Sequence, residues 1–96
     1  MNMDFEIEFN EDKNRLLKET RDICFDDIIE LIKKDKIIKD VRHHNLGKYQ
    51  RQRIFILKIK SYIYAVPYVV SLKKKIVFLK TIYPSRKYKK NYEKKL

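Results

Sequence analysis

The chain has 96 residues and a net charge of +11, and 44% of its residues are hydrophobic and 39% charged. This length suits one domain, residues 1–96, with a single modest core, and the hydrophobic content is sufficient for a folded protein. The only cysteine, Cys24, excludes an internal disulfide and a cysteine-based zinc site, and no apolar run approaches the roughly 18 residues of a membrane span. The N-terminus lacks the basic start and apolar stretch of a signal peptide, so we expect a cytoplasmic protein.

An apolar–acidic alternation over residues 5–9 predicts a strand with one buried face. Asn10 is placed to cap the helix that follows. Residues 22–25 interrupt the helical pattern. Residues 25–34 then predict a second helix, with acids at its start, lysines at its end and an apolar face between them.

The remainder of the chain predicts a sheet and a terminal helix. Strands are predicted at residues 37–41, 54–59, 62–70 and 76–83. Pro67 cannot donate a hydrogen bond to a sheet ladder, so it marks an edge or a bulge, and Pro84 suits the first position of a helix. The predicted fold is α+β, with two N-terminal helices packed on an antiparallel sheet of about four strands and a C-terminal helix.

Charge is distributed unevenly along the chain. Residues 1–35 carry 11 acidic and 6 basic residues, a net charge of −5, whereas residues 36–96 carry 2 acidic and 18 basic residues, a net charge of +16. No acid occurs from Val41 to Tyr92, where all seven tyrosines lie. Such a surface attracts polyanions, and tyrosines offer flat faces for bases, so RNA or DNA is the first partner to consider. Compositional bias would also raise the lysine content, but it explains the absence of acids less well.

Three segments of the chain resemble the BrnT-like toxin family. The family pattern is an aromatic residue, Asp or Asn, and a lysine leading into an Asn-containing helix, then an Ile-x-Phe-acid-acid-aliphatic helix start, and a last strand that runs into a basic pair. The matching segments are Phe9–Lys18, Ile23–Ile28 and Ile76–Lys87. A closer subgroup shares Gln52–Phe55 and Tyr64–Tyr68, so the likeness spans most of residues 5–92.

The resemblance implies a RelE-like fold and a metal-independent endoribonuclease that inhibits translation, the toxin of a type II toxin–antitoxin system. It also implies a cognate antitoxin, either acidic or of ribbon-helix-helix type, bound in a hetero-oligomer. Lys13 matches the family's N-terminal lysine, although an exposed helix lysine is the simpler interpretation. Many members place His-Gly after the first helix, where this chain has Glu19-Thr20-Arg21-Asp22, so a role of that histidine has moved here or is lost.

RNA cleavage without a metal needs a base for the 2′-hydroxyl, an acid for the leaving oxygen and cations around the phosphate. Arg86 is the first candidate because its planar fork can hold two phosphate oxygens at a helix N-terminus, with Lys87 beside it and Tyr83 just before it. His43 and His44 have the only unperturbed pKa suited to proton transfer near neutrality, although adjacent loop histidines are often plain surface residues.

Arg53 is a further catalytic candidate within a predicted strand, where a cation either lines a cleft or lies on a solvated face. The candidates for nucleic-acid binding are Lys13, Lys58, Lys80, Tyr62, Tyr64 and Tyr68. Each tyrosine either stacks on a base or packs half-buried against the core. We expect no metal or other cofactor, because no carboxylate lies between Asp40 and Glu93 to complete a site and a single glycine cannot form a phosphate loop.

Three functions remain compatible with these residues. The first is a toxin-like endoribonuclease whose basic face binds RNA. The second is a non-catalytic basic module that binds nucleic acid and needs only the charge and the tyrosines. The third is a protein-interaction domain whose lysines reflect composition alone.

Overall fold

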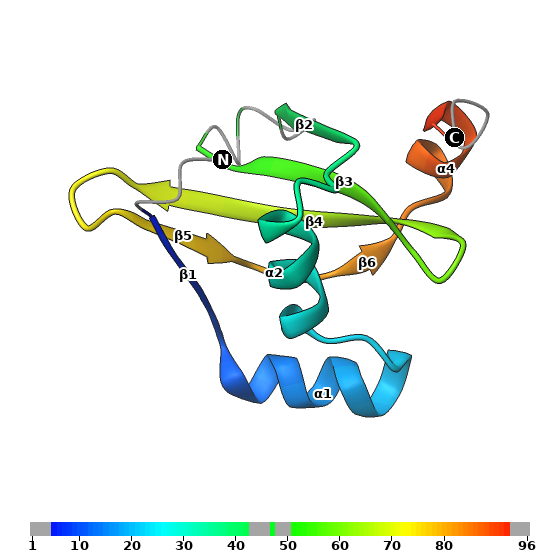
Figure 1. Cartoon of the computed structure of the whole chain (residues 1–96), viewed down its shortest axis with the longest axis horizontal. Coiled ribbons are helices and arrows are strands. Elements are labelled where there is room, and N and C mark those ends of the chain that lie inside the picture. The colour runs from blue at the N-terminus through cyan, green and yellow to red at the C-terminus, as the bar shows by residue number, and fades with distance from the viewer. Residues whose placement is uncertain (1–4, 43–46, 48–50, 93–96) are drawn as a thin grey trace.

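The computed structural model describes residues 5–42, 47 and 51–92, which form an α+β fold. In chain order the described elements are β1 (Glu6–Phe9), α1 (Glu11–Arg21), α2 (Phe25–Lys33), β2 (Lys39–Arg42), β3 (Arg53–Ile59), β4 (Tyr62–Ser71), β5 (Ile76–Leu79), β6 (Tyr83–Pro84) and α4 (Arg86–Tyr92). Figure 1 shows α4 at one end of the sheet and the turn between β4 and β5 at the other.

The sheet is mixed, with the strand order β1-β5-β4-β3-β2 and with β6 paired to β4. The strands β2 to β5 pair antiparallel, as the sequence predicted. The expectation of a wholly antiparallel sheet was wrong, because β1 lies parallel to β5 at the sheet edge. The single last strand predicted over residues 76–83 is divided into β5 and β6.

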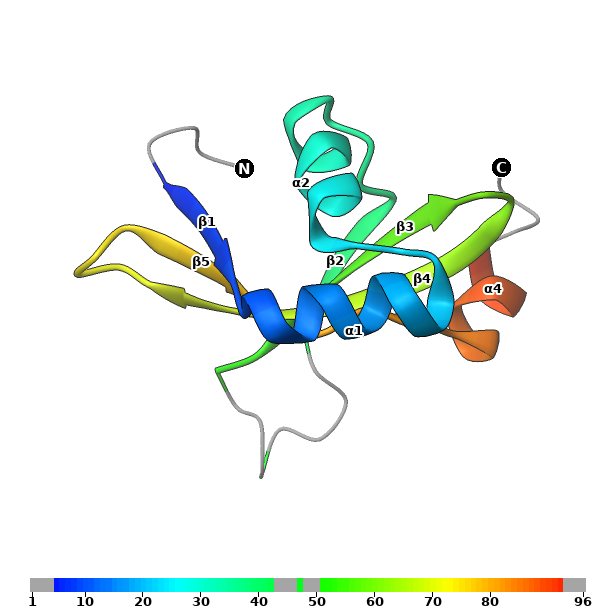
Figure 2. The ribbon, with the colours of Figure 1, turned by 90° about the horizontal axis from the view of Figure 1, so that it is seen from below.

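The two N-terminal helices are where the sequence predicted them. The side-chain oxygen of Asn10 accepts the N–H of Lys13 at 2.9 Å and caps α1. Asp22 ends α1 in the left-handed conformation, with φ of 53°, which aspartate tolerates better than most residues. Figure 2 shows α1 and α2 on the same side of the sheet.

Alternation along the strands divides the apolar residues between the two sides of the sheet. The main core, on the side that we call the α1/α2 face, contains Leu17, Ile23, Phe25, Ile28, Ile32, Phe55, Leu57, Ile59, Val66, Tyr68, Val77, Leu79 and Ile82. The opposite side, the α4 face, has a smaller core of Ile54, Ile56, Ile63 and Ala65, against which Tyr83 and Tyr88 pack. The acidic first third is therefore a covering layer of the fold.

An extra residue separates β5 from β6 opposite Pro67. From the pair Tyr68–Leu79 to the pair Ala65–Tyr83, β4 advances by three residues and its partner segment by four. One extra residue on one strand of a pair is a β-bulge. Pro67 lies opposite the bulge, where the ladder is interrupted and no N–H of β4 is needed for pairing. The prediction of a bulge is confirmed, whereas an edge position is wrong because β4 is central.

The bulge decides which side chains face the main core. Ile82 is fully buried in the main core, while the next residue, Tyr83, packs on the α4 face. Arg21 Nη1 donates to the carbonyl oxygen of Ile82 at 2.9 Å, and Lys80 donates its N–H to the carbonyl of Pro67 at 2.8 Å. Hydrogen bonds from α1 and from the bulge itself thus replace those of the interrupted ladder.

We expect Leu79→Ala to lower the free energy of unfolding by about 2–5 kcal/mol, because it leaves a cavity in the main core. Leu79 is 0% exposed. The same substitution at Leu72, which is 78% exposed, should change the free energy by no more than about 0.5 kcal/mol. Urea denaturation followed by circular dichroism measures both values, and equal losses in the two variants would contradict this description of the core.

Candidate nucleic-acid interface

The β-sheet register brings Lys58 close to the segment that joins β6 to α4. Lys58 lies opposite Ile63 on β3, and the N–H of Ser85 donates to the carbonyl of Ile63 at 3.1 Å from the other side. Tyr83 pairs with Ala65, two residues further along β4. Lys58, Tyr83, Arg86 and Lys87 therefore lie around one end of β4, and we call this group the α4 junction.

Tyr83 is the half-buried member of the α4 junction. Burial against the smaller core raises the pKa of its hydroxyl above the ordinary tyrosine value, and the neighbouring Tyr88 raises it further. Tyr83 is therefore a phenol at neutral pH. It can donate a hydrogen bond to a phosphate oxygen, but it cannot act there as a base.

The start of α4 differs from the prediction. Pro84 belongs to β6, so it is not the first residue of the helix, which begins at Arg86. Ser85 Oγ accepts the N–H of Tyr88 at 3.3 Å, so the serine side chain already occupies one of the amides at the helix start. Arg86 and Lys87 are exposed, and in this seven-residue helix their side chains contribute more to an anion site than the helix itself.

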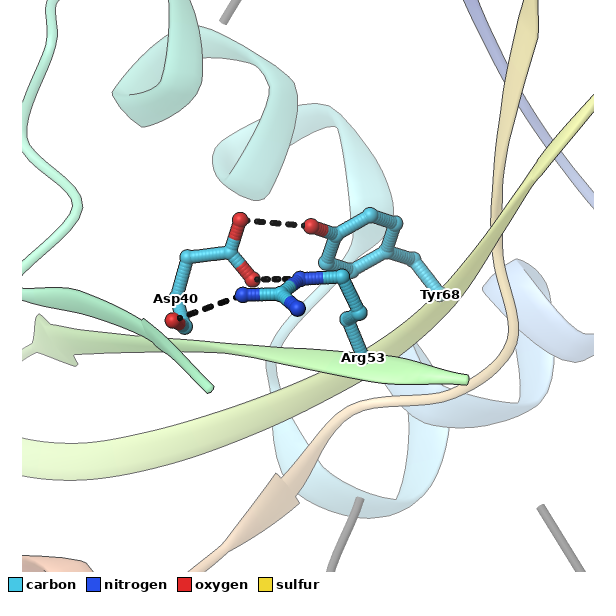
Figure 3. A network of polar contacts seen from close by, with 3 residues as sticks. All are labelled: Asp40, Arg53 and Tyr68. Carbon is cyan, nitrogen blue, oxygen red and sulfur yellow. Dashed lines mark hydrogen bonds and ion pairs between the residues drawn. The ribbon is translucent and has the colours of Figure 1, made fainter. Parts of the chain in front are cut away.

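Arg53 is not part of the α4 junction. Its Nε donates to Asp40 Oδ1 at 3.0 Å and its Nη2 to the Asp40 carbonyl at 3.2 Å, while the hydroxyl of Tyr68 donates to Asp40 Oδ2 at 2.7 Å (Figure 3). Arg53 pairs with Tyr68 at the opposite end of the β3–β4 ladder from Tyr62. The structure therefore separates two of the candidate catalytic arginines and ties Arg53 to a carboxylate.

Tyr68 serves the core rather than the surface. Only 4% of it is exposed, and its ring stacks on Phe55 with centroids 3.9 Å apart and planes 9° from parallel. Burial raises the pKa of Tyr68 well above the ordinary tyrosine value, and the hydrogen bond to the Asp40 carboxylate raises it further. No ring face of Tyr68 remains for stacking on a base.

A pocket of about 440 Å³ opens beside this network on the α1/α2 face. Its floor is apolar and includes Phe55, Val70 and Val77, and Asp40 and Lys39 are its charged residues. Arg53 neutralises Asp40 at 3.0 Å. This side of the sheet therefore offers an apolar surface with little net charge.

Two other candidate tyrosines lie near α4. Tyr62 and Tyr64 make an edge-to-face contact with centroids 5.9 Å apart, and both are half-buried. The ammonium group of Lys89 lies 4.4 Å from the centroid of the Tyr62 ring, a cation–π contact that joins α4 to the start of β4. Tyr64 packs against the main core, so Tyr62 is the better placed of the two for a ligand at the α4 junction.

The remaining candidates are spread over both sides of the molecule. Lys80 is exposed, and its ammonium lies 5.7 Å from the centroid of the Phe78 ring. Lys13 is an exposed residue of α1, in the helical layer away from the α4 face. His43 and His44 lie outside the described residues.

Phe78 is a residue that the sequence analysis missed. It pairs with Val69, which the alternation places with Ala65 and Ile63 on the α4 face. Its ring is half-buried and carries Lys80 over it. The spacing of two residues between Phe78 and Lys80 in a strand was the available signal, because side chains at that spacing share one face.

Four ion pairs join residues of the described part of the chain, namely Arg15–Asp12, Lys34–Glu30, Arg53–Asp40 and Lys60–Asp22. Each of them joins a cation to an acid of the first 40 residues. None includes Arg86, Lys87 or Lys58, although Lys58 also borders a pocket lined by Asp27 and Glu30 of α2. The α4 junction is therefore one of the places where exposed positive charge is left for an anionic ligand.

No protein-family model, curated protein or solved structure matches this chain. No helix among residues 5–42 and 51–92 is long and apolar enough to cross a membrane. Within the same ranges no three His, Cys, Asp or Glu side chains gather in a group that could hold a metal ion.

We expect Tyr68→Phe to lower the free energy of unfolding at pH 7 by about 1–2 kcal/mol, because Asp40 loses a hydrogen-bond donor. The pKa of Tyr68 is raised in the folded protein, whereas an unfolded tyrosine titrates near pH 10, so its stabilising effect is complete below about pH 10 and is lost as the pH rises further. The difference between wild type and variant should therefore shrink above pH 10.

Urea denaturation at pH 7 to 11 measures this difference. Tyr62→Phe is the matched control, since the Tyr62 hydroxyl makes no hydrogen bond with any residue in the described ranges. The same loss in both variants, or a Tyr68→Phe effect that does not vary with pH, would be inconsistent with the network.

Proposed function

We propose that this protein binds RNA through the α4 junction and cleaves it without a metal, as the toxin of a type II toxin–antitoxin system. The observation that carries the binding step is the register of β3, β4 and β6, which gathers Lys58, Arg86 and Lys87 around one end of β4. These cations have no described carboxylate as a partner. Cations that are free of acids attract and position phosphate groups.

Aromatic side chains favour RNA with unpaired bases as the ligand. Tyr62 and Tyr83 lie near α4 and are half-buried, and the ammonium of Lys89 lies over the Tyr62 ring. An unpaired base can stack on such a ring, whereas bases within a duplex are not accessible to it. A single-stranded region is therefore the expected substrate.

The cleavage step rests on the resemblance to BrnT-like toxins. In this proposal the guanidinium of Arg86 holds two oxygens of the pentavalent phosphate, and Lys87 adds a second positive charge. The Tyr83 phenol donates a hydrogen bond to the same group. The described residues of the α4 junction supply no group for proton transfer from the 2′-hydroxyl and to the leaving oxygen, so His43 and His44, outside the described residues, are candidates from the sequence alone.

The fold and the charge are compatible with the rest of the toxin proposal. Two helices cover one face of the sheet and a C-terminal helix lies on the other, which agrees in general class with the RelE-like fold that the resemblance implies. The cognate antitoxin would be a protein with acidic residues that cover the α4 face. Its binding would block the approach of RNA in the cytoplasm.

A non-catalytic RNA-binding module is the second candidate, and one observation favours it. Asp40 holds Arg53 at the other end of the β3–β4 ladder and the Ile82 carbonyl holds Arg21, so neither is free to hold a phosphate beside Arg86. A binding module needs no further group. Binding that weakens steeply with salt, without strand scission, would support this function instead.

We expect the purified protein to cleave a labelled RNA in the presence of EDTA, because the proposed chemistry uses the 2′-hydroxyl and no metal. Arg86→Ala should lower the cleavage rate by about 100-fold, the usual effect of removing one group that stabilises transition-state charge. Gel analysis of the products measures the rate. Expression of the wild type alone should arrest growth, and expression of Arg86→Ala should not.

Arg15→Ala is the matched control, since Arg15 is an exposed residue of α1, in the helical layer away from the α4 face, and its ion pair with Asp12 is exposed. It removes the same charge and should leave cleavage unchanged. If a homogeneous sample does not cut RNA and expression of the wild type is as harmless to growth as expression of Arg86→Ala, the ribonuclease proposal is wrong. RNA binding without cleavage would leave the binding module as the function.

A further inference from the structure

Three adjacent lysines, Lys73, Lys74 and Lys75, form the turn between β4 and β5 and are all exposed. Hydrogen bonds hold the turn on two sides. Ser71 Oγ accepts the N–H of Lys74 at 3.2 Å, and the carbonyl of Lys75 accepts the N–H of Glu6 from β1 at 3.0 Å. The turn is thus a formed part of the sheet that presents three ammonium groups and not a loosely attached loop.

None of these three lysines takes part in an ion pair with a described residue. Leu72, the first residue of the turn, is 78% exposed. Three exposed lysines in sequence repel one another unless an anion lies between them. The turn is therefore the second place, besides the α4 junction, where unneutralised positive charge gathers.

The strand β4 joins these two basic regions. It is the longest strand, with ten residues, and at about 3.4 Å per residue it separates them by about 30 Å. At its first residue, Tyr62, it contacts Lys89 of α4, and after its last residue, Ser71, the lysine turn begins. Figures 1 and 2 show the turn and α4 at opposite ends of the molecule.

Phe78 and Lys80 occupy the sheet between the two regions. The register places Phe78 on the α4 face next to Val69, and the ammonium of Lys80 lies 5.7 Å from the centroid of its ring. A ring and a cation halfway along the path would contact a base and a phosphate of a bound strand. Exposed Glu6 and Glu8 on β1 border this path and confine it to β4 and β5.

We propose that the lysine turn is a second RNA contact, so that one RNA strand binds along β4 from the α4 junction to Lys73–Lys75. This inference rests on the proposed RNA-binding function and adds a length requirement to it. A stacked helical strand advances 3.4 Å per phosphate and an extended strand advances more, so a span of about 30 Å corresponds to at most about nine phosphates. A strand of about four nucleotides can occupy only one of the two regions.

The test measures how affinity depends on the length of the ligand. Oligomers of 2′-O-methyluridine with 4, 8, 12 and 16 nucleotides serve as probes, because the blocked 2′-oxygen prevents cleavage, and fluorescence anisotropy gives each Kd. We expect the 12-mer to bind at least 10-fold more tightly than the 4-mer. The 16-mer should bind more tightly than the 12-mer only by the statistical factor that its larger number of possible binding positions gives.

The variant Lys73→Gln/Lys74→Gln/Lys75→Gln should weaken binding of the 12-mer by at least 10-fold and leave the Kd of the 4-mer at the α4 junction within about 2-fold. It should also reduce the slope of log K against log salt by about 2, since each phosphate contact on a single strand contributes about 0.7. The matched control is Lys18→Gln/Lys33→Gln/Lys36→Gln, which removes three exposed lysines of the helical layer.

The outcomes separate this inference from the function on which it rests. If no oligomer binds at low salt, RNA binding itself is wrong. If the 4-mer binds as tightly as the 12-mer, or if the turn variant and the control weaken binding equally, the second contact is wrong while RNA binding stands. The length series uses the wild-type protein, so it decides the question even if the turn variant does not fold.

Discussion

The bulge opposite Pro67 is the constraint on which the rest of the structure depends. Side chains alternate along a strand, so one extra residue between β5 and β6 changes the side to which every later residue points. Ile82 enters the main core because of it, and Tyr83 reaches the α4 face together with α4. Arg21 stabilises the bulge from α1 by binding the Ile82 carbonyl. A regular ladder would direct Tyr83 to the side that α1 and α2 already fill.

The two faces of the sheet differ in the charged residues that they present, because of this bulge and of the charge distribution along the chain. The helices α1 and α2 cover one face and bring most of the acids with them. Asp22, at the end of α1, pairs with Lys60, and Asp40, on β2, pairs with Arg53. Such exposed pairs contribute little stability. Their effect is on where positive charge remains, which is the α4 junction and the lysine turn. The fold thus places most of the acids in the helical layer, with Glu6 and Glu8 of β1 beside the α4 face.

The sequence predicts most of the fold because its local signals are strong. The cap at Asn10, the break at Asp22 and the two-residue period from Arg53 onward each indicate a single local structure. The parallel pairing of β1 is not predictable in this way, since no local pattern tells which distant strand will be its neighbour. The prediction of Arg53 as a catalytic group shows the same limit. Its partner Asp40 lies on another strand, so only the register reveals that the charge is engaged.

The position of β1 also has a consequence for how the protein forms. Residues 6–9 pair with residues 76–79, so β1 cannot form its hydrogen bonds in the sheet until residues 76–79 have been synthesised. During synthesis β1 leaves the ribosome before its partner strand β5 has been made. The hairpin of β3 and β4, which are neighbours in the chain, can form as soon as both strands have emerged. The sheet is then completed from its middle outward, with β1 last. A nascent chain therefore lacks the hydrogen bond from Glu6 that holds the lysine turn until residues 75–79 have emerged from the ribosome.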